Sequence, residues 1–248
     1  MTDSNVHASA GQMGVLAFGD SITNGGGELQ WGVALQSWAL WVARGLGVPY
    51  TGYAADGAFV SDVVRSQIPA FEARSHPGAR YDVGCLYIGV NDVRTVNWDA
   101  AAFESAFRTA LEFLSERCDR VLTITAPLDL GRPCAGDKVE DLNAVIVRVA
   151  VDVGALVLDL RAWGARNLVM TDHVHPTAFG QIDIAERALD VLARDGASVS
   201  VRPSSLIAYR ITWWQRLRGD VTYAYRHVKV SARAAVLRAW FAARGALG

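Results

Sequence analysis

Cysteine, lysine and long apolar runs are all scarce in this chain of 248 residues. No apolar run reaches the roughly 20 residues that a membrane-spanning helix needs, so we expect no membrane span. Residues 1–12 are polar and lack the basic and apolar regions of a secretory signal, so we expect a flexible N-terminus and a cytoplasmic protein. The three cysteines, Cys85, Cys118 and Cys134, form no CxxC pair, and two of them fall in apolar segments. This pattern favours buried free thiols over a disulfide or a metal site.

Lysine occurs only as Lys138 and Lys229, so the basic residues are nearly all arginines. The charges are unevenly placed, because residues 200–248 hold nine basic side chains and a single acid, Asp220. The other 15 basic and 24 acidic residues precede position 200, which gives that part a net charge near −9 and the tail a net charge near +8. We therefore expect one domain over 13–199 and a separate basic extension over 200–248.

Five short apolar runs alternate with helical stretches between residues 13 and 192. The runs are rich in Val, Leu, Ile and Tyr with little polar alternation, which is typical of strands buried on both faces of a parallel sheet. They are Met13–Phe18, Val48–Ala54, Val83–Ile88, Arg120–Thr125 and Ala155–Asp159. Each run therefore predicts one strand.

Between these runs, apolar residues recur at intervals of three and four, as on one face of a helix. The clearest case is Ala100–Cys118, with Asp99 ahead of it as a candidate N-cap. The same spacing covers Leu35–Leu46, Val60–Arg74, Val139–Val153 and Thr177–Leu192. Strand–helix alternation implies right-handed crossovers and a three-layer α/β domain, in which active groups gather at the carboxyl ends of the strands.

The first apolar run is followed by Gly19, Asp20 and Ser21. A serine just past a buried strand, close to a glycine that permits a tight turn, is well placed to be an exposed nucleophile. A serine in this position is also a common helix cap. This motif alone leaves both interpretations open.

Two further motifs follow the second and third runs. Asn91, in Gly-Val-Asn-Asp, could donate its amide to a developing oxyanion or could close an Asx turn. Gly57 could donate its backbone N–H to the same oxyanion or simply supply a positive φ angle. Both interpretations stay open for each residue.

The segment Asp172-His173-Val174-His175-Pro176 places a carboxylate three residues before a histidine. Because Pro176 keeps the segment out of a helix, Asp172 can fold back and accept from Nδ1 of His175, which leaves Nε2 able to take a proton. The alternative is a capping Asp with a surface histidine. His173 competes for the role of base, but its spacing from Asp172 is wrong, and adjacent residues in an extended segment point apart.

Together these motifs resemble the SGNH hydrolases, also called GDSL esterases and lipases, from Val15 to about Leu192. The elements Gly-Asp-Ser-Ile-Thr, Gly-x-Asn-Asp and Asp-x-x-His-Pro occur in the order of that family and near its usual spacing. The resemblance implies a flavodoxin-like fold with five parallel strands in the order 2-1-3-4-5. It also implies an ester hydrolase that needs no metal and no other cofactor.

The resemblance assigns a role to each of these motif residues. Ser21 matches the nucleophile, His175 the general base and Asp172 the acid that orients the base. The backbone N–H of Ser21, the backbone N–H of Gly57 and the side chain of Asn91 match the three oxyanion donors. On this basis we expect a Ser-His-Asp hydrolase.

Two acids match supporting residues of the family, Asp20 bracing the turn of the nucleophile and Asp92 anchoring its loop. One departure concerns the second strand, where family members often carry an asparagine shortly before the oxyanion glycine. Here that stretch reads Gly-Tyr-Ala over residues 52–54. The departure affects the hydrogen bonding behind Gly57 and not its role as a donor.

The expected substrate is a small-molecule, lipid or carbohydrate ester. A short acyl or acetyl group is preferred, because the loops are short and no lid domain is inserted. Trp31, Phe59 and Leu128 lie in loops that should rim the site, so they are candidates for the substrate pocket, although such aromatic residues often belong to the core. An acyltransferase or thioesterase that uses the same acyl-enzyme is the alternative, and a non-catalytic scaffold is a third interpretation.

The basic tail also repeats apolar residues at intervals of three and four, and we expect two amphipathic helices broken near Gly219. The apolar positions are Ile207, Ile211, Trp214, Leu217, Val221, Tyr225, Val228, Val236, Trp240 and Phe241. We expect these helices to pack on the acidic body or on a second subunit, as a homo-oligomer. Contact with an anionic membrane surface is the alternative. No nucleic-acid partner is expected, because the chain lacks a recognised binding module.

Overall fold

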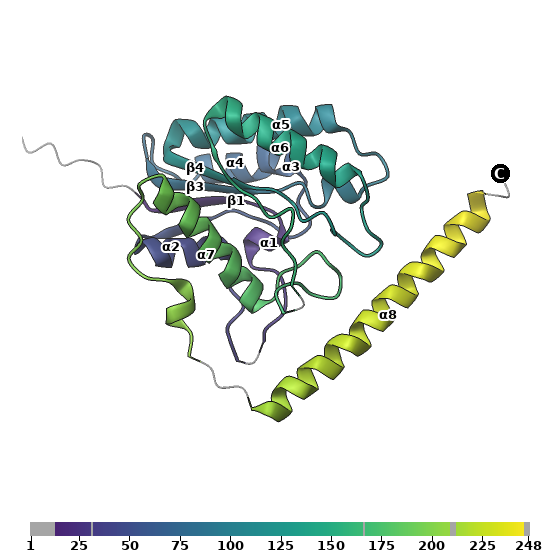
Figure 1. The fold of residues 1–248 in the computed structure, drawn as a ribbon. Coiled ribbons are helices and arrows are strands. Elements are labelled where there is room, and N and C mark those ends of the chain that lie inside the picture. The colour runs from purple at the N-terminus through teal and green to yellow at the C-terminus, as the bar shows by residue number, and fades with distance from the viewer. Residues whose placement is uncertain (1–12, 31, 166, 209–211, 246–248) are drawn as a thin grey trace, which may run out of the picture.

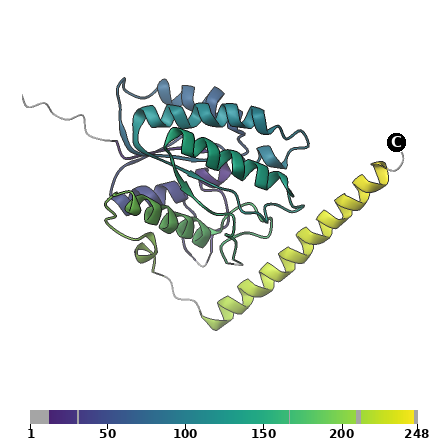
Figure 2. The same cartoon turned by 45° about the horizontal axis from the view of Figure 1, so that its top comes forward.

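The chain forms a five-stranded parallel sheet between two layers of helices (Figures 1 and 2). The computed structural model describes residues 13–245 apart from 31, 166 and 209–211. The strands are β1 Val15–Gly19, β2 Tyr50–Gly52, β3 Tyr81–Tyr87, β4 Cys118–Ile124 and β5 Leu156–Leu158. Their order is β2-β1-β3-β4-β5, and every pairing is parallel. The predicted topology is confirmed, and each strand overlaps its predicted run.

Two pairs of helices cover the faces of the sheet (Figure 1). On one face lie α2 Trp38–Leu46 and α7 Ala178–Arg194, and on the other lie α5 Ala100–Arg117 and α6 Lys138–Val153. Asp99 caps α5 as predicted, since its side chain accepts from two backbone N–H groups of the first turn. The shorter elements are α1 Ser21–Asn24, α3 Val60–Asp62, α4 Ile68–Glu72 and the 3₁₀ turns Asp92–Arg94 and Pro203–Leu206.

A π-helical turn, Val63–Gln67, separates α3 from α4 inside the predicted helix 60–74. Pro69 follows this turn and has no backbone N–H to donate to the preceding turn, which weakens α-helical pairing there. π-Helical turns inside helices are frequent at functional sites. This one ends at Gln67, whose side chain is buried beneath the site described below.

The cysteines are all free thiols, and two of the three lie in the core. Cys85 and Cys118 are buried, as predicted for the apolar segments, and burial raises the pKa of the Cys118 thiol to about 12. Cys134 is exposed, so the prediction of burial is wrong for this residue. It lies in the loop before α6, outside any apolar run.

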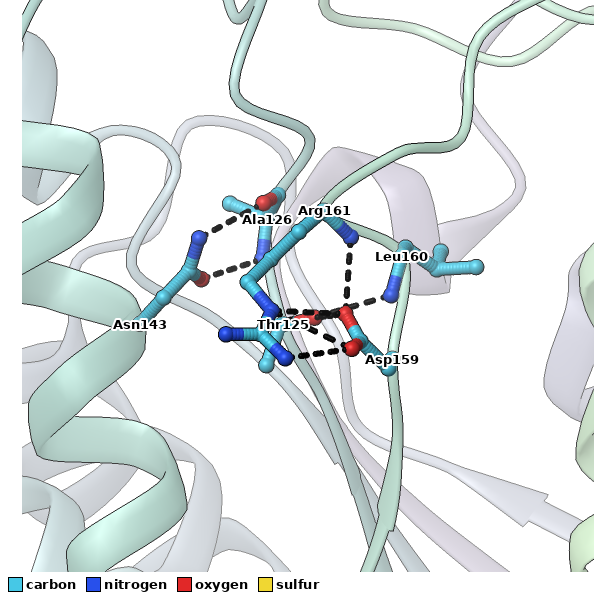
Figure 3. A network of polar contacts seen from close by, with 6 residues as sticks. All are labelled: Thr125, Ala126, Asn143, Asp159, Leu160 and Arg161. Atoms are coloured by element: carbon cyan, nitrogen blue, oxygen red, sulfur yellow. Dashed lines mark hydrogen bonds and ion pairs between the residues drawn. The ribbon is translucent and has the colours of Figure 1, made fainter.

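A polar network ties together the carboxyl ends of β4 and β5 (Figure 3). The Thr125 hydroxyl donates to Oδ1 of Asp159 at 3.1 Å and accepts from the backbone N–H of Leu160 at 2.8 Å. Asn143, buried on α6, donates to the carbonyl of Ala126 and accepts from its N–H, at 2.8 and 2.7 Å. These bonds satisfy backbone groups just beyond the last paired residues of β4 and β5. They fix the loops that leave the carboxyl ends of these two strands.

The basic tail forms one helix, α8 Trp213–Gly245, so the prediction of two helices broken near Gly219 is wrong. A glycine inside a helix costs only about 1 kcal/mol relative to alanine, which is too little to end a helix that its neighbours favour. The expected burial of tail tryptophans on the body is not found either, since Trp214 is 71% exposed and Trp240 is 46% exposed. The side chain of Phe241 and residue Ile211 lie outside the described residues.

The connection between the body and α8 begins on the body itself. Pro203 is buried, and its 3₁₀ turn contacts α2 and α7. Beyond it, α8 runs alongside the body as one long rod (yellow in Figures 1 and 2). Among the described residues, no helix is both long enough and apolar enough to cross a membrane.

Candidate active site

The turn that carries Ser21 is built by its two preceding residues. Asp20 is the N-cap of α1, because its Oδ1 accepts from the backbone N–H of Ile22 at 2.9 Å. Gly19 has a φ angle of +151°, and a Cβ atom there would lie 2.4 Å from the carbonyl oxygen of Tyr87. Glycine is therefore required at the end of β1. With the cap supplied by Asp20, the hydroxyl of Ser21 is left half-buried at the carboxyl edge of the sheet.

A hydrogen-bonded chain connects Ser21 with His175 and Asp172. Oγ of Ser21 lies 2.9 Å from Nε2 of His175, and Nδ1 of His175 lies 2.8 Å from Oδ2 of Asp172. These distances suit a proton transfer from the hydroxyl to the imidazole, with the carboxylate holding the ring. His173 points elsewhere, with its Nδ1 at 2.8 Å from Asp129.

Asp172 and His175 lie in one tight turn. Oδ1 of Asp172 accepts from the backbone N–H groups of Val174 and His175, at 2.9 and 3.1 Å. Burial alone would raise the pKa of Asp172, but these bonds and the bond from the imidazole hold its pKa below the ordinary value. The bond to Asp172 in turn raises the pKa of His175, against the opposing effect of burial. The pair therefore favours a charged imidazolium beside a carboxylate.

Three N–H donors, from Ser21, Gly57 and Asn91, follow the carboxyl ends of the neighbouring strands β1, β2 and β3. The backbone N–H groups of Ser21 and Gly57 donate to no acceptor among the described residues. Gly57 has a φ angle of +75°, which glycine adopts freely. Nδ2 of Asn91 donates to the carbonyl of Ala58 at 3.0 Å, so the second N–H of this amide remains for another acceptor. These groups can receive a negatively charged oxygen.

The loop around Gly57 is anchored without the asparagine that the family often carries. Asp92 accepts from the backbone N–H of Val60 through both oxygens, at 3.2 Å each, so it anchors this neighbouring loop as well as its own turn. On the other side, Nδ2 of Asn24 donates to Oδ1 of Asp56 at 2.9 Å. Burial raises the pKa of Asp92 to about 6. Contacts from α1 and from the Asp92 turn thus hold the loop in place.

Asp20 is almost completely buried, with 1% of its surface exposed. Burial raises its pKa to about 7, although the bond from Ile22 and the nearby His175 both lower it. Its second oxygen, Oδ2, has no hydrogen-bond partner among the described residues. The carboxyl group braces the turn, and it also places a titratable group beneath the histidine.

Two buried glutamines support the Ser21 turn, and sequence analysis missed both. Gln67 accepts from the N–H of Gly19 at 3.0 Å and donates to its carbonyl at 2.8 Å. Gln181, on α7, donates to the carbonyls of Ile22 and Gly26, at 2.9 and 3.1 Å. The only signal in the sequence was a polar residue within the apolar face of a predicted helix, which does not reveal its distant partner.

A comparison of this chain with protein families agrees with the geometry around Ser21, His175 and Asp172. The sequence model of the GDSL-like lipase/acylhydrolase family matches residues 17–181, a segment that contains Ser21, Gly57, Asn91, Asp172 and His175. The chain belongs to this family. It is therefore a carboxylic ester hydrolase on a flavodoxin-like parallel sheet, as predicted. No curated protein sequence matches this GDSL-family hydrolase.

Solved structures share the fold of this GDSL-family hydrolase. Axe2, an acetylxylan esterase from Geobacillus stearothermophilus, is 19% identical, with a TM-score of 0.56 over 74% of this chain and 95% of its own. A member of the lipolytic protein G-D-S-L family from Veillonella parvula is 22% identical, with a TM-score of 0.58 over 73% of this chain and 98% of its own. LAE5, an alpha/beta hydrolase enzyme from the metagenome of Lake Arreo, is 17% identical, with a TM-score of 0.57 over 73% of this chain and 94% of its own.

The predicted pocket residues of this hydrolase do not share one cavity. Phe59 lines a cavity of about 390 Å³ together with Gly57 and Asn91. Leu128 lines a different cavity of about 280 Å³, which includes His173. Trp31 lies outside the described residues. Of the three candidates, Phe59 is the one that shares a cavity with Gly57 and Asn91.

Proposed function

We propose that this hydrolase cleaves short acyl esters, acetyl esters above all, with Ser21 as nucleophile, His175 as general base and Asp172 as its orienting acid. The observation that carries the proposal is the chain of two hydrogen bonds, 2.9 Å from Ser21 to His175 and 2.8 Å from His175 to Asp172. Family membership supports ester hydrolysis, and this geometry supports the individual roles.

The reaction then follows in two steps. Nε2 of His175 takes the proton of Ser21 while Oγ attacks the ester carbonyl, and the imidazolium returns that proton to the departing alcohol. Water, activated by the same histidine, then attacks the acyl-enzyme and releases the carboxylic acid. In both steps the backbone N–H groups of Ser21 and Gly57 and the amide of Asn91 stabilise the oxyanion, each by about 10²–10³ in rate.

Two features support a short acyl group. The described loops after β1, β2 and β4 carry no inserted lid domain. Axe2, which shares the fold, is described as an acetylxylan esterase. We therefore expect the rate to fall as the acyl chain grows.

The proposal is tested with p-nitrophenyl esters from acetyl upward. The Ser21→Ala variant should lose nearly all activity and all labelling by a fluorophosphonate probe, while its fold is unchanged. Ser105→Ala, which removes an exposed hydroxyl on α5, is the matched control and should retain both. More than a few per cent of wild-type kcat in Ser21→Ala would refute the role of Ser21. A kcat/KM that rises steadily with chain length would refute the short acyl group.

A further inference from the structure

Helix α8 presents an apolar stripe that no described residue covers. The stripe residues are spaced by three, four or eight positions, so they share one side of the helix. Their side chains are between 39% and 71% exposed. They are Trp214, Leu217, Val221, Tyr225, Val228 and Val236. A continuous exposed stripe of this kind marks an interaction surface.

Basic side chains run along the adjacent side of the same helix. Arg218, Lys229 and Arg233 are eleven and four residues apart, which places them on one side of the helix, and all three are exposed. The only acidic residue in the whole helix is Asp220. On this side the apolar stripe is therefore bordered by positive charges alone.

The body of the protein contacts a third side of α8, away from the stripe. Arg226 forms an ion pair with Glu28, and the ring of His227 lies 6.2 Å from that of His173. Tyr223 is half-buried and lines two cavities together with residues of the body. Contact with the body thus orients the helix and leaves the apolar stripe facing outward.

From this arrangement we propose that α8 binds an anionic lipid bilayer, with its apolar stripe in the membrane interface and its arginines on the phospholipid headgroups. Helices of this kind lie in the plane of the interface, with aromatic and aliphatic residues on one side and Lys or Arg beside them. Tryptophan and tyrosine, here Trp214 and Tyr225, are the residues that favour this depth.

The charges favour a membrane over a second copy of the chain. If two α8 stripes paired, Arg218, Lys229 and Arg233 of one helix would lie beside like charges of the other, and like-charge pairs destabilise helix association. The body, with its net charge near −9, does not hold the stripe although its charge is opposite to that of the helix. A bilayer offers negative charge and an apolar layer together.

The test uses the full-length protein and sedimentation with vesicles. Vesicles of equal parts phosphatidylcholine and phosphatidylglycerol should bind the protein, vesicles of phosphatidylcholine alone should bind it far less, and added salt should weaken the binding. Replacing Arg218, Lys229 and Arg233 with glutamine should weaken binding on the order of a hundredfold, since each basic side chain contributes about fivefold. The double variant Val221→Glu/Val228→Glu should abolish binding.

Matched controls make the outcome decisive. Val151→Glu places the same charge on α6, where the valine is 72% exposed, and should bind vesicles as the wild type does. Circular dichroism and thermal unfolding of each variant show that α8 and the body remain folded. No binding to anionic vesicles at low salt, or unchanged binding by the Val221→Glu/Val228→Glu variant, would overturn the proposal. A dimer in sedimentation equilibrium that this variant dissociates would also overturn it, as would binding to duplex DNA without binding to vesicles.

Discussion

Replacing Asp20 with asparagine should remove a pH-dependent loss of stability that the buried carboxyl group causes. The pKa of Asp20 is about 7 in the folded protein, against an ordinary value of 3.8. Between these values the folded state holds a proton that the unfolded chain has already released. The contribution of Asp20 to the free energy of unfolding therefore falls as the pH rises from about 4 to about 7, and the loss is complete above the folded-state pKa.

The size of this effect follows from the shift in pKa. Each pKa unit corresponds to 1.36 kcal/mol, so the shift of about 3 units costs about 4 kcal/mol of stability at pH 8. Asparagine retains an oxygen for the bond from Ile22, and it has no charge to bury at any pH. Oδ2 of Asp20 has no partner among the described residues, so the asparagine NH2 group adds a penalty, but one that is independent of pH.

The measurement is urea denaturation of the wild type and Asp20→Asn at several pH values. We expect the stability of the variant relative to the wild type to increase by about 1.4 kcal/mol per pH unit between pH 4 and pH 7 and to level off above. Asp141→Asn, at an exposed position on α6, controls for the substitution itself. A stability difference for Asp20→Asn that is the same at pH 5 and pH 8 would show that the buried carboxyl group does not titrate as argued.

Two further predictions concern the same site. Because the raised pKa of His175 keeps the base protonated at low pH, kcat/KM should rise with pH through a value at or above the ordinary 6.5, and a flat profile from about pH 5 to pH 9 would argue against a histidine base. The Gln67→Leu variant should lose about 2–4 kcal/mol of stability in urea denaturation, because the buried N–H of Gly19 loses its acceptor, whereas the Gly19 carbonyl keeps its bond from Ala55. A loss below about 1 kcal/mol would contradict that account.

Local patterns in the sequence predicted much of this molecule. The apolar runs located every strand, because strands buried on both faces need apolar side chains in succession. The spacing of Asp172 and His175 allowed their contact within one turn, and the family resemblance selected it over a capping Asp with a surface histidine. Family motifs, and not spacing, supplied the strand order and the partnership of His175 with Ser21.

Features that depend on distant contacts could not be predicted in this way. Gln67 and Gly19 are 48 positions apart, and nothing local to either marks the pair. The exposure of Cys134 likewise depends on how its loop folds. The error at Gly219 had a different cause. The low helix propensity of one glycine was expected to end the helix, but the helical pattern of apolar residues on both sides of it outweighs that cost.

The turn that holds Asp172 and His175 has a consequence for variation in this protein. The carboxylate is held by the backbone and the side chain of the same four-residue segment, so its partnership with the imidazole does not depend on packing elsewhere. The acid and base can therefore be displaced together without losing each other. The contact that a distant substitution strains is the one between His175 and Ser21, which joins segments 154 positions apart. Variants outside the site should therefore impair the activation of the serine while the histidine keeps its orientation.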